Sequence, residues 1–131
     1  MAALTWSDDL NVGVDVIDED HRVTVEQLGA LLAADDATFP ALFDAFVEHL
    51  AEHFGREEEL MQKTGFFAYG CHSGEHTRVL GEMRGLLAAA KSGRLAMARA
   101  YVAEAVPDWF LNHRNTMDLV TANFLQQQMV G

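Results

Sequence analysis

Hydrophobic residues recur every three or four positions through most of this chain, which is the period of an amphipathic α-helix. Short polar or glycine-containing breaks separate four such stretches, and we predict helices at about 18–34, 39–63, 69–90 and 93–120. Residues 1–17 lack the period and are predicted to form an irregular arm. Helices of these lengths joined by short loops favour an all-α fold, an up-down-up-down four-helix bundle. The 131 residues are predicted to form a single domain.

Local signals agree with these boundaries. Asp18-Glu19-Asp20 would supply an acidic first turn, Pro40 fits just inside a helix start, and Gly65 marks a helix end. Pro107 falls inside the fourth stretch, where its missing N–H should bend or interrupt the helix near Ala103. The apolar positions expected to face the core are Val25, Leu28 and Leu32; Leu42, Phe46, Leu50, Leu60 and Met61; Val79, Leu80, Met83 and Leu87; and Leu95, Val102, Val106, Phe110 and Met117.

Composition excludes several classes of function. Nine Lys and Arg against twenty Asp and Glu give a formal charge of −11, which argues against nucleic acid and against anionic membranes as partners. Cys71 is the only cysteine, so the chain has no intramolecular disulfide and no thiolate zinc cluster. No basic, apolar leader and no membrane-length apolar run is visible, and we expect a cytoplasmic protein without a membrane span.

The candidate chemistry lies in polar residues that interrupt the apolar stripes. Five of the six histidines occur with a carboxylate or a second histidine nearby: His21, His53 with Glu57, His72 with His76, and His113 with Asp118. A four-residue step on an α-helix turns the side chain by only about 40°, so such pairs leave the same face. Desolvating an imidazole or carboxylate without a partner is costly, and a metal ion would satisfy all seven together.

His49 and the pair Glu58-Glu59 lie next to this set in the sequence, but we do not predict that they bind metal. His49 precedes His53 by one turn, and it either supports the site as an outer donor or wall or packs near the bundle end; neither role binds metal. Glu58 and Glu59 directly follow Glu57, but Glu58 lies about 140° from His53 around an α-helix. We therefore interpret both as part of a solvated acidic face.

The number and kind of donors narrow the metal. Seven nitrogen and oxygen donors are too many for one ion and suit two ions bridged by the carboxylates. Imidazole combined with carboxylate favours iron, with manganese and zinc as chemical competitors. With one shared oxo or hydroxo bridge, two six-coordinate ions would keep one open position. A small diatomic molecule could bind there.

At this point the residues resemble the hemerythrin family, most closely its bacterial, single-domain members. The resemblance covers nearly the whole chain and rests on Trp6 and on four motifs: Gly13-Val-Asp-Val-Ile-Asp-Glu-Asp-His21, His53-Phe-Gly-Arg-Glu57-Glu-Glu-Leu-Met61, His72-Ser-Gly-Glu-His76 and Trp109-Phe-Leu-Asn-His113-Arg-Asn-Thr-Met-Asp118. All seven ligand positions of the family pattern are filled, and the fifteen-residue step from Glu57 to His72 is kept.

The resemblance implies a function. His72, His76 and His113 would hold one iron, His21 and His53 the other, and Glu57 and Asp118 would bridge them. Oxygen would bind reversibly as hydroperoxide at the open site of the two-histidine iron, for transport, storage or supply. The pocket must then be dry and apolar, because water or an acid would release peroxide. The implied partner is O2 or another small diatomic or anion, and the implied cofactor is a pair of iron ions.

Several positions depart from the family pattern. Trp109, Phe110 and Arg114 are the pocket candidates; Phe110 stands where leucine is usual and Arg114 where isoleucine is usual. A guanidinium near the site could admit water or hold an anion, or it could point outward. The competing hypothesis is a diiron enzyme or sensor acting on peroxide, nitric oxide, oxygen or ferrous iron, and a third is a metal-stabilised structural bundle. Polarity around the open site separates carrier from enzyme, and we predict a non-enzymatic protein.

Overall fold

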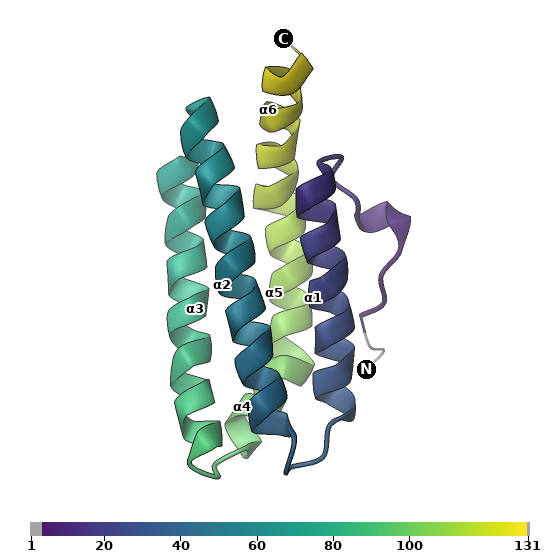
Figure 1. Cartoon of the computed structure of the whole chain (residues 1–131), viewed down its shortest axis with the longest axis vertical. Helices are drawn as coiled ribbons and strands as arrows, with labels where there is room; N and C mark the ends of the chain where they lie inside the picture. The colour runs from purple at the N-terminus through teal and green to yellow at the C-terminus, as the bar shows by residue number, and fades with distance from the viewer. Residues whose placement is uncertain (1–3, 131) are drawn as a thin grey trace.

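Four long helical rods form the molecule, each antiparallel to the next along the chain (Figure 1). The computed structural model describes residues 4–130, with side chains through residue 128. The first three rods are α1 (Asp15–Ala33), α2 (Phe39–Thr64) and α3 (Tyr69–Lys91). The fourth joins α4 (Ala96–Ala100), η2 (Tyr101–Ala105), α5 (Val106–His113), η3 (Arg114–Asp118) and α6 (Leu119–Val130) without interruption. The predicted all-α four-helix bundle is confirmed, and residues 4–130 contain no strand.

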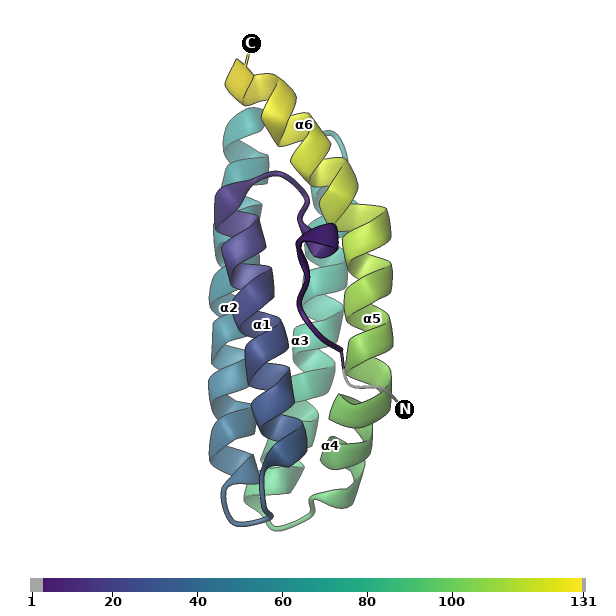
Figure 2. The ribbon, with the colours of Figure 1, turned by 90° about the vertical axis from the view of Figure 1, so that its right-hand side faces the viewer.

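The arm before α1 runs lengthwise over the side of the bundle formed by α1 and the fourth rod (Figure 2). It contains one short helical turn, η1 (Asp8–Leu10). It turns into α1 at Gly13, whose φ of 94° suits glycine, and a Cβ there would lie 2.1 Å from Nε2 of Gln126. The Gln126 amide donates to the Gly13 carbonyl at 2.8 Å, so the arm is fastened to α6.

Helix boundaries differ from the prediction by more than one residue in two of the rods, α1 and the fourth. α1 begins at Asp15, inside the predicted arm, because the Asp18 carboxylate accepts the backbone N–H groups of Val12 and Gly13 at 2.7 and 3.1 Å and closes the preceding turn. The fourth rod begins at Ala96 and continues to Val130, whereas the prediction was 93–120. Its extension is held by Ala122 and Leu125, which are buried beyond the predicted end.

Pro107 does not interrupt the fourth rod. The preceding turn, η2, widens to a π-helix, in which the N–H of Val106 bonds to the carbonyl of Tyr101. A single π-turn can lie within an α-helix without breaking it. The predicted disturbance near Ala103 is thus a widening and not an interruption.

Two apolar clusters divide the interior. The larger one contains Leu28, Phe43, Phe54, Val79 and Val106, and the smaller one contains Val12, Val14, Ile17, Ala122 and Leu125. In α1 and in the fourth rod, the buried polar residues fall between the segments that build these two clusters.

Two predicted core positions are wrong by one residue. Leu32 and Leu42 are 36% and 38% exposed, whereas their neighbours Leu31 and Phe43 are fully buried. No helix in residues 4–130 combines the length and the apolarity that crossing a bilayer requires.

Candidate metal centre

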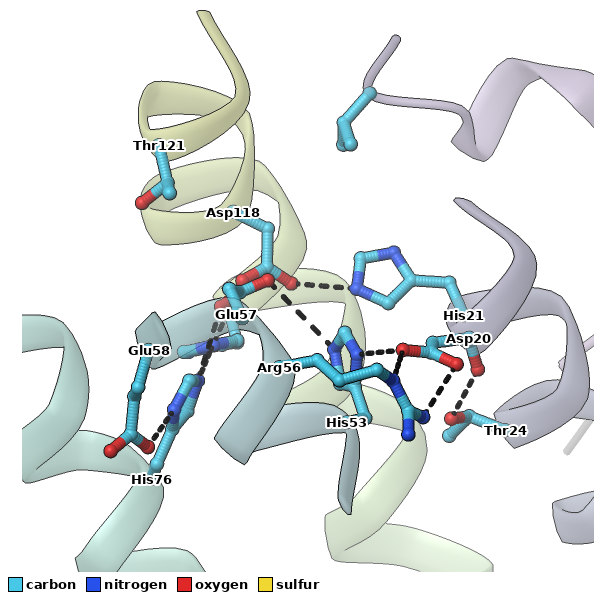
Figure 3. Close-up of polar contacts among 12 residues, drawn as sticks. Asp20, His21, Thr24, His53, Arg56, Glu57, Glu58, His76, Asp118 and Thr121 are labelled. Atoms are coloured by element: carbon cyan, nitrogen blue, oxygen red, sulfur yellow. Dashed lines mark hydrogen bonds and ion pairs between the residues drawn. The ribbon is translucent and has the colours of Figure 1, made fainter. Parts of the chain in front are cut away.

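Seven buried polar side chains converge between the two apolar clusters, and all four rods contribute to them. Figure 3 shows five of them pointing toward one another from α1, α2, α3 and the fourth rod: His21, His53, Glu57, His76 and Asp118. Each of the seven is at most 4% exposed. The complete set is His21 from α1, His53 and Glu57 from α2, His72 and His76 from α3, and His113 and Asp118 from the fourth rod.

Three imidazoles meet on one side, which we call the three-histidine side (His72, His76 and His113). The Nε2 atom of His113 lies 3.1 Å from that of His72 and 3.3 Å from that of His76. The Oε1 atom of Glu57 lies 2.7 Å from Nε2 of His72. The Oδ1 atom of Asp118 lies 3.1 Å from Nε2 of His113.

The remaining two imidazoles form the two-histidine side (His21 and His53). Nε2 of His21 lies 3.0 Å from Oδ2 of Asp118, and Nε2 of His53 lies 3.8 Å from Oε2 of Glu57. Each carboxylate therefore directs one oxygen to each side. This is the arrangement that bridging ligands between two ions require.

The donor set fits two metal ions. Ligand atoms from Glu57, His72, His76, His113 and Asp118 lie within 4.8 Å of one another, and so do those from His21, His53 and Glu57. Both Glu57 oxygens and Oδ1 of Asp118 are buried without a hydrogen bond, although imidazole nitrogens lie close to them. Imidazole nitrogens that face each other repel unless a proton or a cation lies between them. A pair of cations would satisfy all of these atoms at once.

The five-residue step from His113 to Asp118 depends on a local change of helix type. In a regular α-helix this step would separate the two side chains by about 140°. Residues Arg114–Asp118 instead form a π-turn, η3, closed by a bond from the Leu119 N–H to the Arg114 carbonyl. The wider turn brings residues five apart to the same side, and both side chains enter the site.

The pKa values of His72 and Asp118 reflect the opposite charges that the site brings together. Burial lowers the pKa of His72, but Asp118 and Glu57 raise it more strongly, to about 9. Burial raises the pKa of Asp118, but His113, His21 and His72 hold it well below its usual range. A protonated His72 ring thus supplies positive charge to the two carboxylates when no metal is bound. Metal binding would displace this proton.

In three of the histidines the outer ring nitrogen, Nδ1, contacts a residue outside the set of seven. Nδ1 of His53 lies 2.9 Å from Oδ2 of Asp20, that of His72 lies 2.8 Å from Oγ1 of Thr121, and that of His76 lies 2.9 Å from Oε2 of Glu58. These contacts leave Nε2 as the inward donor of each ring. Nδ1 of His21 and of His113 has no hydrogen-bond partner.

Sequence analysis missed all three of these outer partners. Glu58, interpreted as part of a solvated face, instead reaches His76; only Glu59, which pairs with Lys63 at 2.8 Å, fits that interpretation. Asp20 was assigned to an acidic first turn, yet it is 8% exposed and faces α2. Thr121 was not singled out. A lone polar residue on an apolar face, one turn from a ligand, is the sequence signal that could have found it.

His49 lies in the outer layer of the site without reaching its centre. Its Nε2 contacts the Asp20 carbonyl at 3.0 Å and Oγ1 of Thr24 at 3.1 Å, which ties α2 to α1. It is absent from both groups of converging ligand atoms. Of the two roles considered for it, the outer donor describes these contacts.

Aromatic side chains hold the rings and close the site. Phe54 stacks on His76 with centroids 3.8 Å apart, and Trp109 stacks on His113 at 4.5 Å. Phe110 meets His21 edge-on at 5.2 Å. Trp109 and Phe110 line a cavity of about 10 Å³ that also touches His21, His53, His113 and Asp118. Both therefore lie where the pocket candidates were expected.

Arg114, the third pocket candidate, faces away from this cavity. Its guanidinium donates to the backbone carbonyls of Asp9, Leu10 and Asn11 at 3.1, 3.0 and 2.7 Å. It holds the end of η1 against the fourth rod and does not line the cavity. Of the two orientations considered for Arg114, the outward one describes these contacts, because the arm supplies a set of carbonyl acceptors on the outer face of η3.

A larger apolar cavity, about 250 Å³, lies near Cys71, Met117 and Val120. Among the seven converging residues it touches only His72, beside Thr121, the partner of that ring's outer nitrogen. It does not reach the two-histidine side, so the small cavity at His21 and His53 is the relevant one for the metal centre.

Comparisons with known proteins agree with this geometry. A family model described as "Hemerythrin HHE cation binding domain" matches residues 12–123. A bacteriohemerythrin of Ralstonia nicotianae is 33% identical over 128 residues, covering 98% of this chain and 93% of that protein. A myohemerythrin of Sipunculus nudus is 27% identical over 113 residues, 86% of each chain. A crystal structure of wild-type hemerythrin shares the fold with a TM-score of 0.87 at 23% identity, over 95% of this chain and 98% of that one.

Proposed function

This chain belongs to the hemerythrin family, and we propose that it holds two iron ions and binds dioxygen reversibly at the two-histidine side, for transport, storage or supply. The ligands would be the Nε2 atoms of the five histidines together with the carboxylates of Glu57 and Asp118. Bound there, a ferrous pair supplies two electrons to dioxygen and recovers them when oxygen leaves.

The observation that carries this proposal is the lining of the small cavity. Besides the four ligands, it consists of Thr24, Leu50, Phe54, Trp109 and Phe110. Only two of these side chains carry a polar hydrogen, and each is engaged elsewhere: Oγ1 of Thr24 donates to the Asp20 carbonyl at 2.8 Å, and Nε1 of Trp109 donates to Oε1 of Glu75 at 2.9 Å.

Such a lining favours a carrier over an enzyme. A free acid or a water channel at the cavity would help to protonate and release reduced oxygen, which is what an oxidase needs. Arg114 was the residue that could have supplied a polar group, and it binds the arm instead. The cavity volume of about 10 Å³ corresponds to roughly one water-sized molecule, a size that favours a small ligand such as a diatomic over larger substrates.

The test is to load the protein with ferrous iron without air, admit oxygen, and remove it again while recording the visible spectrum. A charge-transfer absorption that appears with oxygen and disappears on its removal is expected. Rapid and irreversible conversion to the diferric form would favour an oxidising enzyme. Metal analysis that finds one zinc per chain would overturn both.

A further inference from the structure

The outer nitrogens of the metal-site histidines do not all meet the same kind of partner. Nδ1 of His53 contacts a carboxylate, Asp20, that is itself paired with a cation. Arg56 donates to both Asp20 oxygens, from Nε at 2.9 Å and from Nη2 at 2.8 Å (Figure 3). The side chains of Arg56, Asp20 and His53 are 42%, 12% and 4% exposed, so the three form a line from solvent to the centre.

The corresponding contact on the three-histidine side is simpler. Glu58 contacts Nδ1 of His76, and among residues 4–128 no lysine or arginine pairs with Glu58. His72 has a neutral hydroxyl partner, Thr121. The combination of an anion and a cation behind one histidine is therefore specific to His53, on the side where the small cavity lies.

The Asp20 backbone is fixed as well as its side chain. Nε2 of His49 contacts the Asp20 carbonyl at 3.0 Å and Oγ1 of Thr24 at 3.1 Å. Asp20 is thus held from α2 at two points, through its carbonyl by His49 and through its carboxylate by Arg56 and His53. This rigidity gives the His53 ring one orientation.

We propose that Asp20 and Arg56 act as an opposed pair of positioning residues that sets the electron donation of His53, and thereby the redox potential at the two-histidine side. A carboxylate behind an imidazole makes the inward nitrogen a stronger donor and stabilises the more highly charged ion. A guanidinium on the same carboxylate draws part of that negative charge away. Asp20 lowers the potential, and Arg56 offsets part of the lowering. The inference rests on the proposed iron centre.

The test compares Arg56→Gln, Asp20→Asn and the double variant in the iron-loaded protein. The midpoint potential and the rate of oxidation in air are measured. Arg56→Gln should lower the potential and speed oxidation, Asp20→Asn should raise the potential and slow oxidation, each by roughly tenfold in rate, and the double variant should fall between them. Arg56→Lys keeps the positive charge and should stay near the parent protein.

Two controls carry the same charge changes away from His53. Arg22→Gln removes an exposed arginine that pairs with Glu19 and Glu26, and Asp44→Asn removes an exposed carboxylate that pairs with Lys91. Neither should change the rate more than about twofold, since exposed charges are strongly screened. If both test variants shift the potential in the same direction, the proposal is overturned, because the shift would not depend on the sign of the charge removed. It is also overturned if neither variant shifts the potential more than the controls do.

A measurement on the zinc-loaded protein separates this inference from the oxygen chemistry. Zinc has no redox activity, and the 15N chemical shift of Nδ1 in His53 reports its hydrogen bond directly. The shift should move in Asp20→Asn and in Arg56→Gln, in opposite directions, and stay fixed in the controls. An unchanged shift would overturn the proposal. Failure of reversible oxygenation would overturn the proposed function alone, since neither the potential nor the zinc measurement uses oxygen.

Discussion

The two sides of the metal centre hold their imidazole rings in different ways. On the three-histidine side aromatic rings lie nearly flat on the ligands, with interplanar angles of 3° for Phe54 on His76 and 15° for Trp109 on His113. On the two-histidine side Phe110 meets His21 edge-on at 79°, and among the residues that the structure describes no ring stacks flat on His21 or His53. Flat stacking fills the space above a ring, whereas an edge-on contact leaves a gap beside it. The packing of aromatic rings therefore assigns the free space to one side, in addition to the unequal number of ligands.

Glu57 is one of the two carboxylates that join the two sides, and its loss should have the largest effect. Glu57→Ala removes an oxygen from each side, so we expect both metal ions to be lost and not one. Metal analysis after anaerobic reconstitution measures this. Glu59→Ala, which removes an exposed carboxylate two positions away, is the control and should keep two ions per chain. A Glu57→Ala protein that retains a full ion on either side would show that the carboxylate is not shared.

Phe110→Ala should remove the edge-on wall and enlarge the space at the two-histidine side. The lost burial should cost about 3–5 kcal/mol of unfolding free energy, and water should enter and speed oxidation of the oxygenated protein. Chemical denaturation and the decay of the visible spectrum measure the two effects. Phe43→Ala, in the larger apolar cluster, should lose similar stability without faster decay. Equal decay in both variants would mean that stability, and not the wall, protects the site.

Glu58→Gln addresses the three-histidine side alone. The neutral amide accepts a weaker hydrogen bond from Nδ1 of His76, so metal affinity should fall by about tenfold or somewhat more. Competition with a chelator measures this, and Glu59→Gln is the matched control. The ion on the three-histidine side should leave first. If the ion of His21 and His53 leaves first, the contact of Glu58 does not act through His76.

Arg114→Ile should have the smallest effect at the metal. Because the guanidinium binds the arm and does not face the cavity, the decay of the oxygenated protein should be unchanged. Loss of its contacts to three arm carbonyls should lower the unfolding free energy by about 1 kcal/mol. Slower decay in this variant would place the arginine in the pocket after all.

The sequence was sufficient to predict the fold and the seven side chains that converge, because the apolar period and the spacing of these residues are both local properties of a helix. It was insufficient wherever packing against a neighbouring rod determines which side chains are buried and what they contact. Glu58 lies on a face of α2 that would be solvated on an isolated helix, but α3 brings His76 to it. Asp20 lies in a run of three acidic residues that would suit a solvated first turn, but α2 brings Arg56 and His53 to it. The single-residue errors at Leu32 and Leu42 have the same origin, since rotation of a rod about its axis is set by its partners.

The step from His113 to Asp118 was assumed to be compatible with a helix, and only the π-turn makes it so. This wide turn makes the fourth rod sensitive to chain length. Deleting one residue between His113 and Asp118 would leave a four-residue step, which a regular α-helix turns by only about 40°, so both side chains would stay on one face. Inserting one residue would instead rotate everything after the turn by about 100°. Asp118 would leave the centre, Thr121 would leave His72, and Ala122 and Leu125 would leave the smaller apolar cluster together. A substitution in this turn changes one side chain, whereas an insertion would rotate all of the fourth rod that follows it.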